Sequence, residues 1–266
     1  MNTILGYFVT FLVGISLGVM GSGGSILTVP NLVYLFGIPP LLATTYSLFL
    51  VGTTAMIGSI PNIRNRRLNF PLILTFGLPS IIAMIATRRW ILPNIPEMIT
   101  LPIMGTISKD IVMMIFFAII MILAALSMIR QKKGTEMLFC ALKITMKTAP
   151  LLMLQGIAIG CLSGLLGAGG GFLMIPGFVI LAKVPIKQAI ASSLFIVGIN
   201  SLMGFLSDYQ QWGALNISLL GLMILISIGG ILIGNRIVRH INTAKLKPLF
   251  GYFILLIALF ILVKGI

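Results

Sequence analysis

Charged side chains, and acidic ones above all, are scarce in this chain. Among 266 residues there are 4 Asp and Glu, 1 His and 2 Cys, and charged residues make up only 8% of the total. A soluble domain of this length needs about a quarter of its residues charged to cover its surface. The scarcity excludes a water-soluble fold. The 59% apolar content and the mean hydropathy of +1.17 predict an integral membrane protein.

The same scarcity removes most active-site chemistry. The four acids lie in connectors or at the ends of apolar segments: Glu97, Asp110, Glu136 and Asp208. Together with a single histidine they offer no cluster suited to acid–base or nucleophilic catalysis. Cys140 and Cys161 have neither metal-ligand spacing nor an obvious partner. We therefore expect no enzyme activity, no metal, no cofactor and free thiols.

Basic residues, in contrast, are common. The chain has 18 Lys and Arg and a formal net charge of +14. They are spread over the connectors between apolar runs, where such residues set membrane topology. This placement favours the lipid bilayer over nucleic acid as the partner of the positive charge.

Apolar runs long enough to cross a bilayer recur along the whole chain. Six are continuous, at about residues 42–60, 70–86, 111–129, 186–206, 215–233 and 246–263. Two more, at about 4–36 and 151–181, are interrupted by glycines. No separate soluble domain fits between these segments.

The two glycine interruptions are copies of one motif. GVMGSGGSILTVP begins at Gly18 and GLLGAGGGFLMIP begins at Gly164, and the same alignment pairs Gly14 with Gly160. It continues into a shared Ser-Leu-Phe sequence at Ser47 and Ser193. We interpret the chain as a tandem duplication: residues 1–130 form the first repeat, 131–148 a basic connector and 149–266 the second repeat.

The basic residues help to orient the repeats. If each glycine-broken segment crosses the membrane fully, the Lys and Arg residues divide equally between the two sides. If each instead turns at its glycines and leaves on the side it entered, 14 of the 18 fall on one side, which becomes the cytoplasmic side. This favours an all-α polytopic membrane protein of two inverted repeats, each a re-entrant hairpin followed by three transmembrane helices.

A glycine turn at membrane depth leaves backbone N–H groups without helical partners, which is tolerated only beside protein or a wet cavity. In inverted-repeat transporters such turns meet near the midplane and direct half-helix N-termini at an anion. The candidate binding residues here are Gly21, Ser22, Gly23, Gly24 and Ser25, with Gly167, Ala168, Gly169, Gly170 and Gly171. The alternative is that these small residues serve close helix packing.

The helix after each turn adds polar side chains at equivalent positions. Ser47 pairs with Ser193, and Thr54 with Asn200. They are candidate substrate ligands, although hydroxyl groups on membrane helices often bond only their own backbone. The absence of acids from the apolar segments favours an anionic or neutral substrate over a cation.

The duplicated glycine cluster followed by proline, and then the Ser-Leu-Phe helix, resembles the sulfite exporter TauE/SafE family over nearly the whole chain. The resemblance implies a secondary permease for a small anion: sulfite, an organosulfonate or another sulfur oxyanion. Alternating access would occur around the paired glycine turns. It also implies a multi-pass protein of a bacterial-type inner membrane. An organic-acid permease of the same fold, a channel-like conduit and a non-transporting scaffold or sensor remain alternatives, and homo-oligomerisation stays open.

Overall fold

A computed structural model describes residues 2–21, 23–101, 105–130, 148–167, 169–171, 174, 178, 184, 186–237 and 243–264. Three parts of the sequence prediction lie outside these residues: Ser22 and Ala168 of the candidate site, and nearly all of the basic connector, 131–147.

The first half is helical up to Asn94. It contains α1 (Asn2–Met20), the 3-10 helix η1 (Gly23–Leu27), α2 (Thr28–Phe36) and α3 (Pro40–Arg64). One long helix follows, made of α4 (Phe70–Leu72), α5 (Leu78–Ala86) and α6 (Leu92–Asn94) joined by the π-helical segments η2 (Ile73–Gly77) and η3 (Thr87–Ile91).

The rest of the chain is also mostly helical in the residues that the structure describes. It contains α7 (Lys109–Arg130), α8 (Ala149–Leu166), α10 (Ile186–Ser207), the 3-10 helix η4 (Tyr209–Ala214), α11 (Ile217–Ile237) and α12 (Thr243–Lys264). Within the described residues, seven helices are long and apolar enough to cross a membrane. The predicted all-α polytopic membrane fold is confirmed.

Two boundaries differ from the prediction. The helix predicted to end near Ala86 continues to Asn94. The segment after it, for which the sequence predicted only a connector, forms a hairpin of β1 (Met98–Leu101) and β2 (Gly105–Ser108), paired antiparallel with Ile99 opposite Ile107.

The first glycine-broken segment folds back on itself. The Asn31 side-chain amide in α2 donates hydrogen bonds to the Gly6 carbonyl, at 3.1 Å, and to the Thr10 hydroxyl, at 2.9 Å, both in α1. The Phe36 ring, at the end of α2, packs edge to face against Tyr7 near the start of α1. Contacts between the late part of α2 and the early part of α1 define a helical hairpin whose bend is at the glycines.

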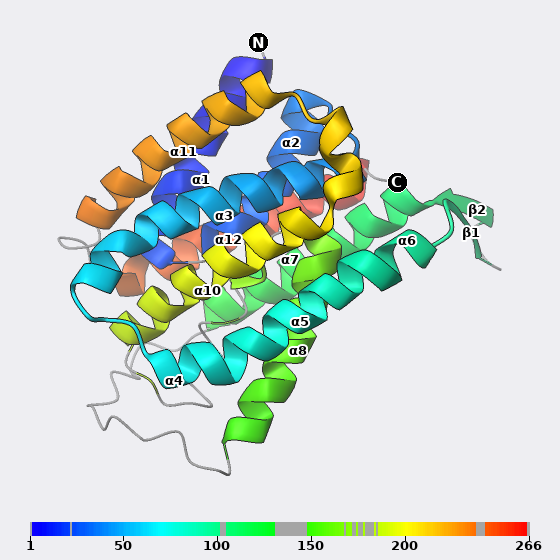
Figure 1. Cartoon of the computed structure of the whole chain (residues 1–266). Helices are drawn as coiled ribbons and strands as arrows, with labels where there is room; N and C mark the ends of the chain where they lie inside the picture. Colours follow the sequence, from blue (N-terminus) through cyan, green and yellow to red (C-terminus); the bar gives the residue numbers. More distant parts are fainter. Residues whose placement is uncertain are drawn as a thin grey trace.

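Two equivalent helices, α3 and α10, pack side by side in the middle of the bundle (Figure 1). A Cβ placed at Gly52 would lie 3.0 Å from the Leu202 backbone nitrogen, and one at Gly58 would lie 3.5 Å from Leu194. Partner numbers fall in α10 as they rise in α3, so these helices run antiparallel. They are also the most buried of the candidate spans: 67% and 61% of the residues are buried in the 18-residue apolar window of each span.

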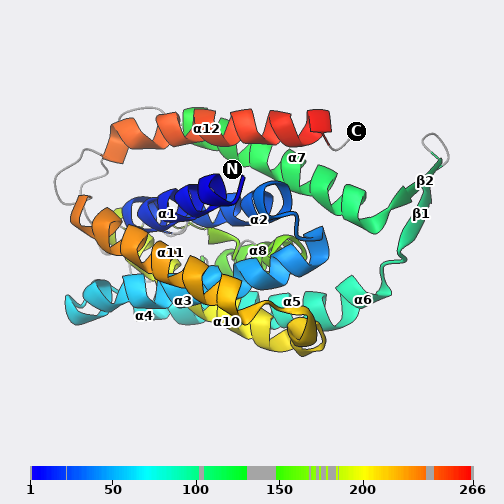
Figure 2. The same cartoon turned by 90° about the horizontal axis from the view of Figure 1, so that it is seen from above.

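The remaining helices pair across the two halves in equivalent ways. A Cβ at Gly14 of α1 would lie 2.3 Å from the Ser227 carbonyl oxygen in α11. A Cβ at Gly160 of α8 would lie 2.3 Å from the Ser80 carbonyl oxygen in α5. Such close backbone approach explains why both positions are glycine. The last helices of the halves, α7 and α12, pack together on one side of the bundle (Figure 2).

The outer faces of the helices are apolar rather than charged. Leu74, Ile82, Leu154, Leu225 and Leu256 are each more than half exposed. Exposed apolar side chains on helices of this length are typical of a protein surrounded by lipid. Polar groups lie inside instead: Ser47, Thr54 and Asn200 are fully buried. Any polar site in this protein therefore lies between the helices.

Candidate substrate-binding site

The first glycine turn lies against the second half of the molecule. Gly21 ends α1 with φ +71°, and a Cβ there would lie 3.3 Å from the Ser193 hydroxyl oxygen and 3.0 Å from the Ile190 carbonyl oxygen, both in α10. Gly23, Gly24 and Ser25 follow in η1 and are buried. The predicted first turn thus packs on the helix that carries the predicted ligands of the other repeat.

The second turn makes the reciprocal contact with α3. Gly167 ends α8 with φ +64° and donates its N–H to the Ser163 carbonyl oxygen at 2.9 Å. A Cβ there would lie 2.3 Å from Thr44 Cβ. Positive φ and this contact exclude any side chain at the position. Gly169, Gly170 and Gly171 are buried beside it.

Gly169 lies between the two central helices, α3 and α10. A Cβ there would lie 2.7 Å from the Ser201 hydroxyl oxygen, 2.9 Å from Val197 and 3.6 Å from Val51. Val51 and Val197 are equivalent residues of α3 and α10, so a contact with both places Gly169 at the midline of the central pair. The two turns therefore border one pair of helices.

The four predicted side-chain ligands have different surroundings. All are fully buried. The Ser193 hydroxyl donates to the Ile190 carbonyl oxygen of its own helix at 3.0 Å, as a structural serine does. The Asn200 amide donates to the Ser80 hydroxyl at 2.7 Å. Ser47 Oγ, Thr54 Oγ1 and Asn200 Oδ1 have no hydrogen-bond partner among the described residues.

Unpaired buried polar groups cost free energy and are rare in proteins, so each calls for an explanation. Three further serines share the condition and were not among the predicted ligands: Ser163 Oγ, Ser201 Oγ and Ser227 Oγ. The sequence contained a signal for Ser227, because the alignment that pairs Asn69 with Asn216 also pairs Ser80 with Ser227. The hydroxyls thus provide donors between the helices that the protein itself does not use.

Two cavities border this region. One of about 170 Å³ is lined by Ile95, Lys109, Phe116 and Leu166 among others, and one of about 10 Å³ by Thr44 and Leu166 among others. The predicted glycine and hydroxyl ligands line neither cavity. Around the described part of the turns, the side chains are in contact.

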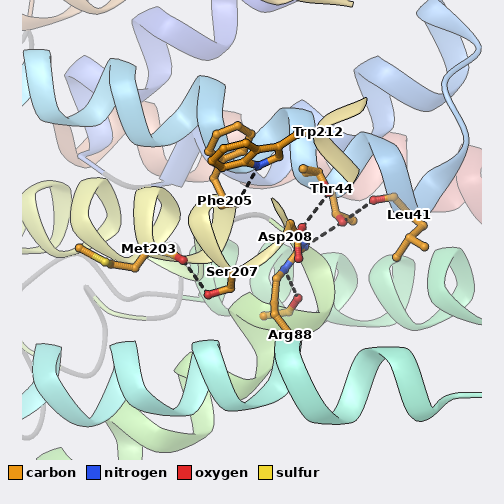
Figure 3. Close-up of polar contacts among 10 residues, drawn as sticks. Leu41, Thr44, Arg88, Met203, Phe205, Ser207, Asp208 and Trp212 are labelled. Carbon is orange, nitrogen blue, oxygen red and sulfur yellow. Dashed lines mark hydrogen bonds and ion pairs between the residues drawn. The ribbon is translucent and has the colours of Figure 1, made fainter. Parts of the chain in front are cut away.

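A buried ion pair lies next to the second turn, and the sequence analysis missed it. Arg88 in η3 is 2% exposed and Asp208, just after α10, is 8% exposed. The guanidinium Nη1 donates to the Asp208 carboxylate (Figure 3). Asp208 lies at a helix end, as predicted, but the sequence analysis did not foresee that it is buried and paired there.

Hydroxyls and backbone complete this cluster (Figure 3). Arg88 Nη2 donates to the Thr44 hydroxyl at 2.8 Å, and Nε donates to the Gly164 carbonyl oxygen at 2.9 Å. The Thr45 hydroxyl donates to the Asp208 carboxylate at 2.7 Å. The apolar Trp90, Ile91 and Leu92 after Arg88 were the available signal, since they indicate that the helix continues past the arginine.

Comparisons with known proteins agree with a membrane transporter. A probable membrane transporter protein of Xylella fastidiosa is 27% identical and covers 94% of this chain and 91% of its own length. Bacillus subtilis YunE, also named a probable membrane transporter protein, is 25% identical over 78% and 81%. A Haemophilus influenzae protein of the same description is 29% identical over 76% and 72%. No solved structure matches significantly.

The class is thus that of multi-pass membrane transporters. The model of one family, described as sulfite exporter TauE/SafE, matches residues 7–261. The chain belongs to this family.

Proposed function

We propose that the protein is a secondary permease of a bacterial-type inner membrane that moves a small anion: sulfite, an organosulfonate or another sulfur oxyanion. The family description supports the substrate class. The names of the relatives support membrane transport in general.

The observation that carries the proposal is the set of unused donors between α3 and its neighbours. Ser47 and Thr54 hydroxyls are buried without partners beside the helix pair that both glycine turns touch. An anion's oxygens accept hydrogen bonds from hydroxyl and backbone N–H groups. Glycine lets such oxygens approach the backbone closely. We assign anion binding to these hydroxyls and to the two turns.

The charges in the described core are consistent with an anion. Asp208 is the one buried carboxylate in the described part of the chain, and Arg88 neutralises it. Glu97 is exposed, and Asp110 is half-buried at the start of α7. A path for cations would need an uncompensated acid at depth. The described core provides none.

The arrangement of the halves supports alternating access. Equivalent helices α3 and α10 run antiparallel, as do α7 and α12 (Figures 1 and 2). Helices related by duplication that run in opposite directions are expected of inverted repeats, in which one half rocks against the other around a central site. Each glycine turn rests on the other half's central helix, so such a movement would change both turns together.

Flux measurements test the proposal. Purified protein in liposomes should move at least one of sulfite, sulfoacetate or thiosulfate, measured with and without a proton gradient to identify coupling. Lactate in the same assay separates an organic-acid permease from a sulfur-anion permease. Liposomes that move none of these anions would remove the support for transport of this class and leave the scaffold or sensor interpretation.

A further inference from the structure

The Arg88–Asp208 cluster has a chemistry that the shared fold of the two repeats does not require. Burying two charges between packed helices is costly even when they are paired. The repeat mate of Arg88 is Asn235, and the mates of Thr44 and Thr45 are Ile190 and Ala191. The second set of positions has no charge and no hydroxyl. The bundle therefore forms in one half without this cluster, so the cluster serves something other than architecture.

Its position ties it to the second glycine turn. Arg88 Nε bonds the carbonyl oxygen of Gly164, in the last turn of α8. The Thr44 hydroxyl accepts a hydrogen bond from Arg88 Nη2, and Gly167 packs against Thr44. Arg88 itself lies in the π-helical segment η3, and π-helical segments inside α-helices occur frequently at functional sites.

The two cavities lie beside this cluster. Thr44 lines the smaller cavity, which shares Met113, Leu165 and Leu166 with the larger one. Lys109 lines the larger cavity and donates to the Leu92 and Ile95 carbonyl oxygens at 2.5 and 3.4 Å. The two cavities thus lie next to each other, and the smaller one borders a hydroxyl that is bonded to Arg88.

We propose that Arg88 is the anion-recognition residue of the permease and that Asp208 holds its guanidinium until an anion replaces the carboxylate. This rests on the proposed function. The planar guanidinium fork binds carboxylate oxygens in pairs, and the oxygens of sulfite or a sulfonate have matching charge and spacing. Asp208 keeps the Thr45 hydroxyl as a donor after it leaves Arg88. Displacement therefore strips neither charge of all its partners.

Binding is tested on purified full-length protein in detergent, by the shift in melting temperature with sodium sulfite, sulfoacetate or thiosulfate against chloride at equal ionic strength. A ligand that binds only the folded state stabilises it by RT ln(1 + [L]/Kd), so the shift in melting temperature grows with the logarithm of the affinity once the ligand is in excess. Wild type should be stabilised by at least one of the three. Loss of a hydrogen-bonded charge corresponds to roughly 10- to 100-fold in affinity.

Three variants and a control define the expected result. Arg88→Lys and the double variant Arg88→Gln/Asp208→Asn should weaken binding by roughly that factor. Asp208→Asn should strengthen binding because it removes the competing carboxylate. The control is Arg89→Gln, which removes an exposed positive charge from the next residue and should bind like wild type. The double variant leaves no unpaired charge, so its folding does not depend on the ion pair.

Each outcome bears on one proposal or the other. If the double variant binds the anion as wild type does, or if none of the three anions stabilises wild type, the role of Arg88 is refuted. If wild type binds an anion through Arg88 but liposomes show no flux, the recognition site stands and the permease proposal fails. If wild type and the double variant transport with the same KM, the permease stands and the recognition site fails.

Discussion

Replacing Thr54 by valine should separate a substrate ligand from a structural hydroxyl. Thr54 Oγ1 is fully buried in α3 and has no hydrogen-bond partner among the described residues. In the other half the equivalent residue, Asn200, donates to Ser80. Valine has the same branched shape as threonine and differs by one methyl in place of the hydroxyl, so the substitution removes the polar group with little change in packing.

The stability of the Thr54→Val variant and its rate of transport should change in opposite directions. An unpaired buried hydroxyl costs about 1–3 kcal/mol, and hydrogen bonds within membrane proteins average about 0.6 kcal/mol, so the variant should be as stable as wild type or about 1 kcal/mol more stable. If the hydroxyl donates to a bound anion, its loss removes about 1.5–3 kcal/mol of that interaction. The value of kcat/KM should then fall roughly 10- to 100-fold.

Thr53 supplies the matched control. It is the preceding residue of the same helix, but its hydroxyl donates to the Phe49 and Leu50 carbonyl oxygens at 2.7 and 3.1 Å. Thr53→Val should therefore leave anion flux unchanged. Initial flux into liposomes, normalised to reconstituted protein, gives the transport value, and thermal unfolding in detergent gives the stability. Wild-type flux in Thr54→Val would refute the assignment of this hydroxyl to the substrate.

Two further predictions concern the fold. Gly160→Val should lower the melting temperature strongly, because the valine side chain would meet the Ser80 carbonyl oxygen. Gly221→Val is the control and should not lower it, since nothing lies within 4 Å of a Cβ at Gly221. Equal melting temperatures for the two variants would contradict the α8–α5 contact. In a background without native cysteines, Asn65→Cys should react with an impermeant thiol reagent from the cytoplasm and Gln210→Cys from outside, and reaction of both from one side would contradict the inverted arrangement.

Hydrophobic length and glycine spacing predicted most of the fold. Runs of apolar residues are long in this chain and end at basic or polar residues, so the observed helices begin and end within a few residues of most predicted segments. The α1–α2 hairpin followed from the Lys and Arg residues, which gather on one side of the membrane only if the glycine-broken segments turn back. Both predictions use patterns that can be read directly along the chain.

Contacts between distant segments could not be predicted in the same way. Arg88 and Asp208 are 120 residues apart in sequence. Each lies next to a connector, where a charged side chain is ordinarily solvated. Only the packing of α3, α5, α8 and α10 shows that the two charges share one buried cluster. The unpaired state of Thr54 is likewise invisible in sequence, since Thr53 beside it has the same side chain and is fully bonded.

The glycines of the turns cannot by themselves reveal a binding site. A Cβ at Gly24 would lie 2.8 Å from Ser16 Cβ, and one at Gly170, where φ is +64°, would lie 2.8 Å from Ile159. Leucine at either position would therefore disrupt the hairpin whether or not an anion binds there. A loss of transport in such a variant would not separate packing from recognition.

The side chains around the turns can make that separation, because they differ between the halves. The turns themselves share a left-handed glycine at Gly21 and Gly167, yet among the residues that the structure describes only the second turn has a buried arginine beside it. If the halves exchange conformations during transport, the anion meets a charged site next to one turn and a neutral one next to the other. Its affinity should then differ between the two sides of the membrane, and that difference should depend on Arg88 and not on the glycines.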